Sequence, residues 1–254
     1  MGSRSLVVAC VLGLATACGA PAPRWSPPAD LSADDAVLYV SSDCNAVLVG
    51  PTTALTAAHC VEEPEPLHVR VGARVVPVTR CDVHPRAYAE PRPCGAGPGR
   101  TELDHDLALL TLAEPVGVAP VPVLLAEPAL RPGWWRDLSV RLVGWDRRPR
   151  FVGPLARRSG DNQIVDMRRG VFVTAPVGAE GFRTIVGDSG GPALIRVGGI
   201  ERVAGVLRGG PSLGSPRSVY AATFEPDNAR WLVDVLPREV TLDLPEDGAG
   251  RFGR

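Results

Sequence analysis

The sequence predicts an all-β protein, and three observations support this prediction. The 254 residues include 26 prolines and 28 glycines, which favour frequent turns and disfavour long helices. Apolar residues occur in short runs, and several runs show the period of two expected of half-buried strands, as at Leu67, Val69 and Val71. The hydrophobic content of 45% is enough to form a sizeable core.

Twelve short apolar runs are the expected strands. The first group comprises residues 37–40, 47–49, 54–56, 67–71, 75–79 and 107–110. The second group comprises residues 140–145, 164–167, 171–174, 193–197, 203–207 and 219–223. The proline-containing segment 115–122 is expected to cross between the two groups. After the last run, Ala229, Leu232, Val233 and Leu236 recur at helical spacing and predict one short helix over about 227–236.

Residues 1–18 are typical of a targeting segment, which predicts export. They combine the basic Arg4 with an apolar run, 6–14, that is too short to span a bilayer. The following Ala15-Thr16-Ala17-Cys18 resembles a bacterial lipobox, in which Cys18 is lipidated and attaches the protein to a membrane, although Ala15 stands where leucine is usual. Ordinary signal cleavage at the same place is the alternative. The expected location is therefore the periplasm or cell envelope as a lipoprotein, or outside the cell as a secreted protein.

Two further segments are expected to lie outside the packed domain. Residues 19–33 are rich in proline and alanine and predict a linker. Residues 237–254 are expected to form a flexible tail. The net charge of −1 does not indicate a nucleic-acid partner, and all 27 basic residues are arginine. No cofactor and no metal are expected.

The stretch Gly187-Asp188-Ser189-Gly190-Gly191-Pro192 places a serine on a glycine-rich turn. A nucleophilic hydroxyl needs such a turn, with free backbone N–H groups beside it to bind a developing oxyanion, and Gly187 and Ser189 are the natural donors. A plain glycine-rich turn is one alternative. The nucleophile elbow of α/β-hydrolases is another, but there the histidine follows the serine. All four histidines here (His59, His68, His84 and His105) precede Ser189, which excludes it.

The order histidine, aspartate, serine fits a different family. His59 lies in Leu-Thr-Ala-Ala-His-Cys, and Asp106 lies in Asp-His-Asp-Leu-Ala-Leu-Leu. With the serine motif, these stretches resemble the T-A-A-H-C, D-[IL]-A-L-L and G-D-S-G-G-P motifs of chymotrypsin/trypsin-like serine peptidases. Residues 140–145 are similar to the family's V-x-G-W-G strand, and residues 218–221 to its G-V-Y-A strand. The resemblance covers about residues 37–236, and three motifs in the right order make it specific.

The resemblance implies an all-β fold of two six-stranded antiparallel Greek-key barrels with a short C-terminal helix. The peptidase domain would span 34–236. The first barrel would cover about 34–120, the second about 121–225 and the helix about 227–236. His59 and Asp106 would then come from the first barrel and Ser189 from the second.

The resemblance also implies roles for these residues. His59 is the expected general base, Asp106 the acid that orients its imidazole, and Ser189 the nucleophile that forms an acyl-enzyme. Asp104 is a competing acid, and Asp104 and His105 are expected to be solvated neighbours. The expected function is an exported serine endopeptidase, a monomer acting on polypeptides. The alternative is a catalytically silent binding module of the same fold.

Four cysteines remain after the targeting segment, and they allow three connectivities. The resemblance implies a disulfide between Cys60, beside the expected base, and Cys44, which leaves Cys81 to pair with Cys94. Exported proteins can keep such bonds. A metal site at Cys60, Cys81, His84 and Cys94 is an alternative, but it lacks the C-x-x-C pair common in such sites.

The expected substrate pocket departs from the family pattern. Arg183 stands where the family has its pocket floor, and a basic floor would favour an acidic substrate side chain. Alternatively, Arg183 turns away to Asp188 or to solvent. Arg208, Gly209 and Gly210 stand where the family has S-W-G, and Ile185 replaces a cysteine.

Asp188 raises the question of activation. In animal members this aspartate pairs with a new amino terminus released by cleavage, which normally begins I-V-G-G. No such stretch precedes Cys44. We therefore expect an internal arginine, Arg141 or Arg183, to neutralise Asp188 without cleavage.

Overall fold

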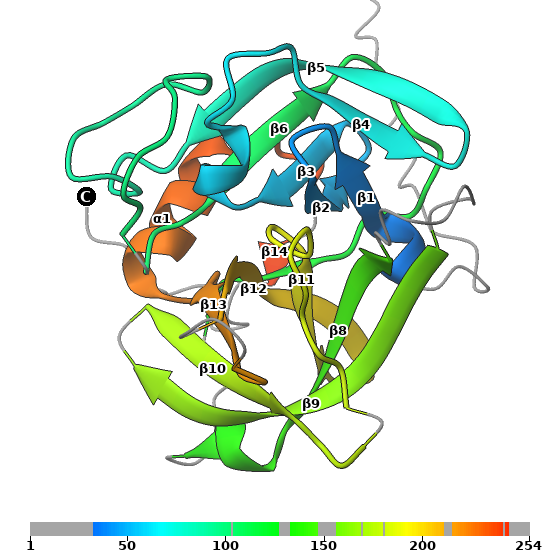
Figure 1. Ribbon diagram of the computed structural model, residues 1–254, viewed down its shortest axis with the longest axis vertical. Coiled ribbons are helices and arrows are strands. Elements are labelled where there is room, and N and C mark those ends of the chain that lie inside the picture. The colour runs from blue at the N-terminus through cyan, green and yellow to red at the C-terminus, as the bar shows by residue number, and fades with distance from the viewer. Residues whose placement is uncertain are drawn as a thin grey trace, which may run out of the picture.

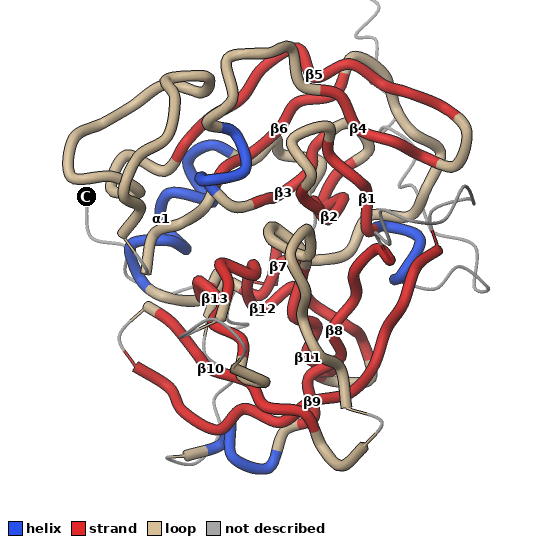
Figure 2. Tube along the Cα trace, in the orientation of Figure 1, coloured by secondary structure: helices blue, strands red, loops and turns tan. Residues whose placement is uncertain are grey.

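The computed structural model describes residues 33–102, 104–126, 133–146, 156–168, 170–179, 181–210, 215–240 and 242–243. The predicted targeting segment with Cys18 lies outside the described residues, as does the predicted linker apart from Ala33. Strands account for most of the regular structure, as the tube in Figure 2 shows.

The first barrel is built from the amino-terminal half and closes in the order β1-β2-β3-β6-β5-β4, with every pair antiparallel (Figure 1). Its strands are β1 (Val37–Val40), β2 (Cys44–Gly50), β3 (Thr53–Thr56), β4 (His68–Val71), β5 (Arg74–Val83) and β6 (Ala108–Leu112). Every residue of β2 and β3 is buried. These strands therefore lack the alternation of a half-exposed strand, because both of their faces are covered.

The second barrel closes in the order β8-β9-β10-β13-β12-β11, with β11 pairing back to β8. Its strands are β8 (Ser139–Asp146), β9 (Ala156–Arg168), β10 (Val171–Pro176), β11 (Pro192–Val197), β12 (Ile200–Gly209) and β13 (Ser218–Ala222). Two short parallel strands, β7 (Val123–Leu124) and β14 (Leu242–Asp243), extend the sheet beyond β12. Both six-stranded antiparallel barrels and the C-terminal helix are confirmed.

Each of the twelve expected runs lies within or overlaps one of these barrel strands. The main difference is β9, which begins at Ala156, whereas hydrophobicity predicts a strand only over 164–167. The added portion is polar, and it is a strand because it pairs with β8 along its whole length, from Ser139 opposite Gln163 to Asp146 opposite Ala156. Tertiary pairing thus overrides the local pattern there.

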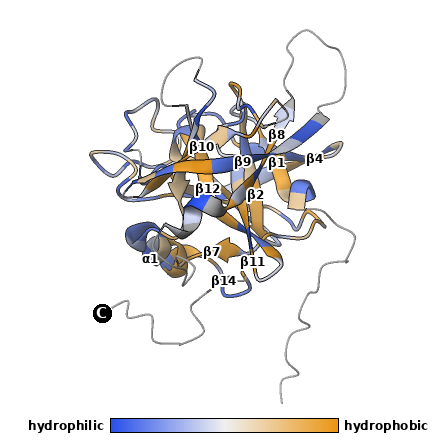
Figure 3. Ribbon diagram, turned by 90° about the horizontal axis from the view of Figure 1, so that it is seen from below, coloured by the Kyte–Doolittle hydropathy of each residue, from blue (hydrophilic) through white to orange (hydrophobic). Residues whose placement is uncertain are grey.

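Helix α1 (Pro226–Val235) is the expected C-terminal helix. The Glu225 side chain caps it by accepting hydrogen bonds from the backbone N–H groups of Asp227 and Asn228, and Pro226 occupies the first turn. Ala229 and Leu232 are buried against the first barrel's core. In Figure 3 the helix shows both hydrophobic and hydrophilic colour, as expected for such an amphipathic element. Among the described residues, no helix has the length and apolar character needed to cross a membrane.

The described residues also form three single-turn 3-10 helices: η1 (Ala33–Ala36), η2 (Ala58–Val61) and η3 (Trp134–Asp137). Of the expected flexible tail, 237–254, the structure describes residues 237–240 and 242–243. Val240 is only 5% exposed and packs with the core, and β14 pairs with β7. Apolar contact and strand pairing therefore hold the start of this segment on the domain.

The two barrels meet where the start of β2 contacts the turn that carries Ser189. The Asn45 backbone N–H donates to the Ser189 carbonyl (2.7 Å), and its side-chain amide donates to the Gly187 carbonyl (3.1 Å). The Thr56 hydroxyl donates to the Asn45 carbonyl (2.6 Å). Gly190 lies so close that a Cβ there would meet Asn45 O at 2.1 Å and Thr56 Oγ1 at 2.3 Å. We call the contact among these five residues the barrel clasp.

The barrel clasp predicts that Gly190→Ala destabilises the protein far more than Gly198→Ala. Both glycines have positive φ, 79° and 57°, but a Cβ at Gly198 would meet no described atom within 4 Å. Gly198→Ala should cost about 1–2 kcal/mol for the left-handed backbone. Gly190→Ala should cost about 1–3 kcal/mol more, because the barrels must also separate. Urea unfolding of both variants tests this, and equal midpoints would show that the close approach is not needed.

Candidate active site

His59 and Asp106 are brought together by the pairing of β3 with β6. His59 lies in η2, just after β3, and Asp106 lies just before β6, whose Ala108 is paired with Thr56 of β3. His59 Nδ1 lies 2.7 Å from Asp106 Oδ2, and the His59 backbone N–H donates to Asp106 Oδ1 at 3.0 Å. Asp106 is fully buried. The carboxylate therefore holds the imidazole in one orientation, with Nδ1 as the donor and Nε2 free to accept a proton.

The electrostatics of the pair favour a basic imidazole. Burial lowers the pKa of His59, but the hydrogen bond and negative charge of Asp106 outweigh it and raise the pKa above 6.5. Glu62 acts in the same direction, whereas the positive charge of Arg208 opposes it. The His59 side chain keeps 27% of its surface exposed, so a substrate can reach it.

Ser189 sits on a turn whose backbone is tied down on both sides. Gly190 N–H donates to the Leu207 carbonyl (2.8 Å) and Gly191 N–H to the Asp188 carbonyl (3.0 Å). Gly187 has a φ of 99°, a conformation suited to glycine. Within the described residues, the amides of Gly187 and Ser189 donate to no protein acceptor. Two neighbouring N–H groups are thus available for an anion at the place expected from the sequence.

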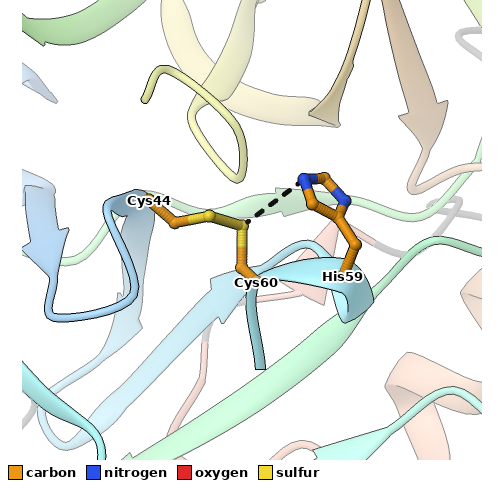
Figure 4. Close-up of side chains that lie close together, drawn as sticks. All are labelled: Cys44, His59 and Cys60. Carbon is orange, nitrogen blue, oxygen red and sulfur yellow. Dashed lines mark hydrogen bonds between the residues drawn. A yellow bond between two sulfur atoms is a disulfide. The ribbon is translucent and has the colours of Figure 1, made fainter. Parts of the chain in front are cut away.

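The histidine and the serine turn are linked through Asn45. The disulfide Cys44–Cys60 joins the residue before Asn45 to the residue after His59. Figure 4 shows the imidazole directed toward this disulfide, with Nε2 3.8 Å from Cys60 Sγ. No hydrogen bond joins His59 to Ser189 among the described residues. Catalytic hydrogen bonds are often long in unbound sites and shorten when substrate binds.

Both expected disulfides are present, Cys44–Cys60 and Cys81–Cys94. The metal interpretation at Cys60, Cys81, His84 and Cys94 is therefore wrong, because sulfurs bonded to each other are not thiolate ligands. The same holds for Cys44, His59 and Cys60, whose ligand atoms lie within 4.8 Å of one another.

The competing residues near Asp106 have structural contacts instead. The Asp104 carbonyl accepts a hydrogen bond from the Asn228 amide (2.7 Å). His105 was expected to be solvated, and this is wrong: it is buried, stacks on His84 at 4.8 Å and bonds Asn228 Oδ1 through Nδ1 (2.8 Å). Burial, reinforced by the charge of His105, lowers the pKa of His84 to about 4. These histidines connect the first barrel with α1.

Asp188 is neutralised by an arginine, but not by either expected one. The carboxylate is 1% exposed, forms an ion pair with Arg158 and accepts from the Ile185 backbone N–H (2.7 Å). Arg141 instead pairs with Asp34 and Glu201, and the Arg183 side chain is exposed. Both expected partners are therefore wrong.

The sequence did not indicate Arg158 as the partner of Asp188, because Arg158 lies in the polar part of β9, where no strand was expected. The strand register places Arg158 opposite Gly144 of β8. A Cβ at Gly144 would lie 2.2 Å from Asp188 Oδ1, so this glycine leaves room for the carboxylate. The resemblance of residues 140–145 to a family strand predicts β8 itself. It does not predict that Arg158 of β9 pairs opposite Gly144, which is what brings Arg158 to Asp188.

The three residues expected to form the substrate pocket, Arg183, Arg208 and Gly210, have different surroundings. Arg183 receives a hydrogen bond from Arg158 on its backbone carbonyl (2.9 Å), and its side chain forms no contact with a described polar group. Arg208 lies at the end of β12 and is partly exposed, and Gly210 is exposed just beyond it. Their roles in substrate binding stay predictions.

Comparisons with known proteins agree with this geometry. The family model described as Trypsin matches residues 32–231. A trypsin of Saccharopolyspora erythraea is 27% identical over 201 residues, covering 70% of this chain and 81% of that protein. A tryptase of Mus musculus is 25% identical over 253 residues, covering 85% and 86%. Beta-fibrinogenase mucrofibrase-1 of Protobothrops mucrosquamatus is 24% identical over 226 residues, covering 82% and 84%. The chain therefore belongs to the trypsin family of serine peptidases.

Proposed function

We propose that this protein is a serine endopeptidase that hydrolyses polypeptides through His59, Asp106 and Ser189. The observation that carries the proposal is the fully buried Asp106 paired with the partly exposed His59, across the barrel clasp from a serine turn with two free amides. Family membership supports a polypeptide as the substrate.

The geometry supports the following mechanism. His59 Nε2 takes the proton from Ser189 Oγ, and the oxygen attacks the carbonyl carbon of the scissile peptide bond. The N–H groups of Gly187 and Ser189 stabilise the oxyanion of the tetrahedral intermediate. His59 then gives its proton to the leaving amine, which leaves an acyl ester on Ser189. Water, deprotonated by His59, attacks that ester, and His59 returns the proton to Ser189 Oγ as the peptide acid leaves. Asp106 stabilises the imidazolium in both steps.

A catalytically silent binding module remains the second candidate. The absence of a described hydrogen bond between His59 and Ser189, together with the departures at Arg183 and Arg208, favours it. The retention of all three triad residues and of Gly187 with positive φ favours the enzyme.

A fluorophosphonate probe distinguishes these two functions. It should label wild-type protein on Ser189, because the reaction needs an activated hydroxyl and a formed oxyanion site. Ser189→Ala should not be labelled, and His59→Ala should be labelled far more slowly. Mass spectrometry of the labelled peptide provides the measurement. An unlabelled wild-type protein would favour the binding module.

The His59–Asp106 pair predicts the pH dependence of activity. The reaction needs neutral His59, and its pKa is raised above 6.5, so kcat/KM should rise with pH through a midpoint above 6.5. Asp106→Asn should lower kcat by about 10⁴-fold, because the imidazole loses its oriented tautomer. Asp104→Asn is the matched control and should keep the wild-type profile. A larger loss for Asp104→Asn than for Asp106→Asn would contradict the assignment.

We also propose that no activating cleavage is needed. Arg158 ties together three parts of the loop before Ser189: it pairs with Asp188, donates to the Arg183 carbonyl (2.9 Å) and lies 4.4 Å from the Phe182 ring centre. A buried carboxylate left without its partner is strongly destabilising. An internal cation already present on β9 thus supports an ordered loop in the uncut chain.

The expected result is that intact protein turns over peptides without a lag. Arg158→Gln should lower kcat/KM by about 10²-fold, the effect of losing an ordered oxyanion site. Arg168→Gln, an exposed residue of the same strand that pairs with Asp166, should match wild type. Progress curves, with mass spectrometry to show an uncut chain, give the measurement. A lag that only a trace of protease removes would contradict the proposal.

We propose in addition that the protein is exported and monomeric. The basic and apolar character of residues 1–18 supports export, and Cys18 would attach the protein to a membrane if it is lipidated. Two disulfides in the described domain fit an oxidising compartment.

A further inference from the structure

Arg208 lies beside the nucleophile because β12 is bonded to the serine turn. Leu207, the residue before it, donates through its N–H to the Gly191 carbonyl (2.8 Å) and accepts from the Gly190 N–H (2.8 Å). The Leu207 side chain is buried in the core of the second barrel. Successive side chains of a strand point to opposite faces, so the Arg208 side chain leaves that core. Its charge acts on His59, which places it on the active-site side.

The Arg208 guanidinium has no partner within the described part of the protein. Its Nε atom is buried and makes no hydrogen bond, and no described carboxylate forms an ion pair with it. The buried carboxylate of Asp106 already accepts hydrogen bonds on both oxygens from His59. The residue is partly exposed, and none of its guanidinium nitrogens has a described acceptor, so a carboxylate that reaches the exposed part of the group would gain charge-assisted hydrogen bonds.

The chain next to Arg208 leaves space for such a ligand. Gly209 has a φ of 152°, and a Cβ added there would meet no atom of the described residues within 4 Å. Gly210 follows and is exposed. Two residues without side chains thus follow the arginine, where the polypeptide substrate would approach Ser189.

We propose that Arg208 determines specificity by binding a carboxylate of the peptide substrate close to the scissile bond. The inference rests on the proposed peptidase function and names its substrate class. A guanidinium binds a carboxylate through two parallel hydrogen bonds, which gives direction as well as strength. The carboxylate comes from an acidic side chain or from the free end of the peptide, and both supply the same acceptor.

Carboxylate binding would also affect His59. The positive charge of Arg208 opposes protonation of the imidazole, and a bound anion cancels that charge. The imidazolium formed during the reaction is then more stable. An acidic substrate should therefore have a higher kcat as well as a lower KM. Arg208 acts on substrate directly and on the histidine through its charge.

Matched peptides test the inference. We compare internally quenched peptides in pairs that differ only by Asp against Asn, or Glu against Gln, at one of three positions before the scissile bond. Each peptide is made with a free and with an amidated carboxyl end. Wild type should prefer the carboxylate member of a pair by at least about 10-fold in kcat/KM, the usual gain from a charged hydrogen bond. Arg208→Gln should abolish the preference and Arg208→Lys should keep part of it. Arg196→Gln, an exposed arginine of β11, should leave it unchanged.

The outcomes separate this inference from the proposed function. Fluorophosphonate labelling of Ser189 with equal turnover of acid and amide peptides would keep the peptidase and overturn the role of Arg208. A preference that survives Arg208→Gln but is lost in Arg183→Gln would overturn it in favour of Arg183. A preference confined to peptides with a free carboxyl end supports the carboxylate site and assigns the chain end as its source. Absence of both labelling and turnover in wild type would overturn the peptidase itself.

Discussion

The barrel clasp is the contact on which the candidate site depends. His59 and Asp106 belong to the first barrel and Ser189 to the second, so no local structure places them together. Asn45 bridges the gap with two hydrogen bonds to the serine turn, and Gly190 allows the backbones to approach within a distance that any side chain would prevent. A misplacement of about 1 Å at a catalytic group can cost about 10²-fold in rate. A rigid contact made largely by backbone atoms suits this requirement.

Charge is distributed around the serine turn in three separate arrangements. Asp106 is compensated by His59, and Asp188 by Arg158 and a backbone N–H. Arg208 is the exception among these groups, since it meets no described acceptor. Buried charges are normally paired, as Asp106 and Asp188 are, whereas the charge of the partly exposed Arg208 is available to the carboxylate ligand proposed above. Because His59 pairs with Asp106 and Arg158 pairs with Asp188, neither carboxylate is left to bind Arg208.

The fold was largely predictable, because short apolar runs bounded by glycine and proline correspond to most of the strands. The motifs correctly predicted that His59 and Asp106 come from the first barrel and Ser189 from the second, and the family resemblance predicted the Cys44–Cys60 disulfide. The catalytic roles of the three residues stay predictions. Asn45 and Arg158 were not predictable. Neither stands in a distinctive pattern, and each acquires its contact only through tertiary structure, Asn45 by crossing between barrels and Arg158 through the register of β8 and β9. His105 was misjudged for a related reason: its polar neighbours suggested solvent, whereas α1 covers it.

The Cys44–Cys60 disulfide has a consequence for where the site can form. It fixes Asn45 of the barrel clasp and the segment of His59 to each other by covalent bonds. In a cell compartment where glutathione keeps thiols reduced, that link would be missing, and only strand pairing and the hydrogen bonds of the barrel clasp would position the histidine relative to the serine turn. Newly made chains would therefore acquire their full geometry only after sulfur oxidation, which couples the maturation of the protein to its surroundings.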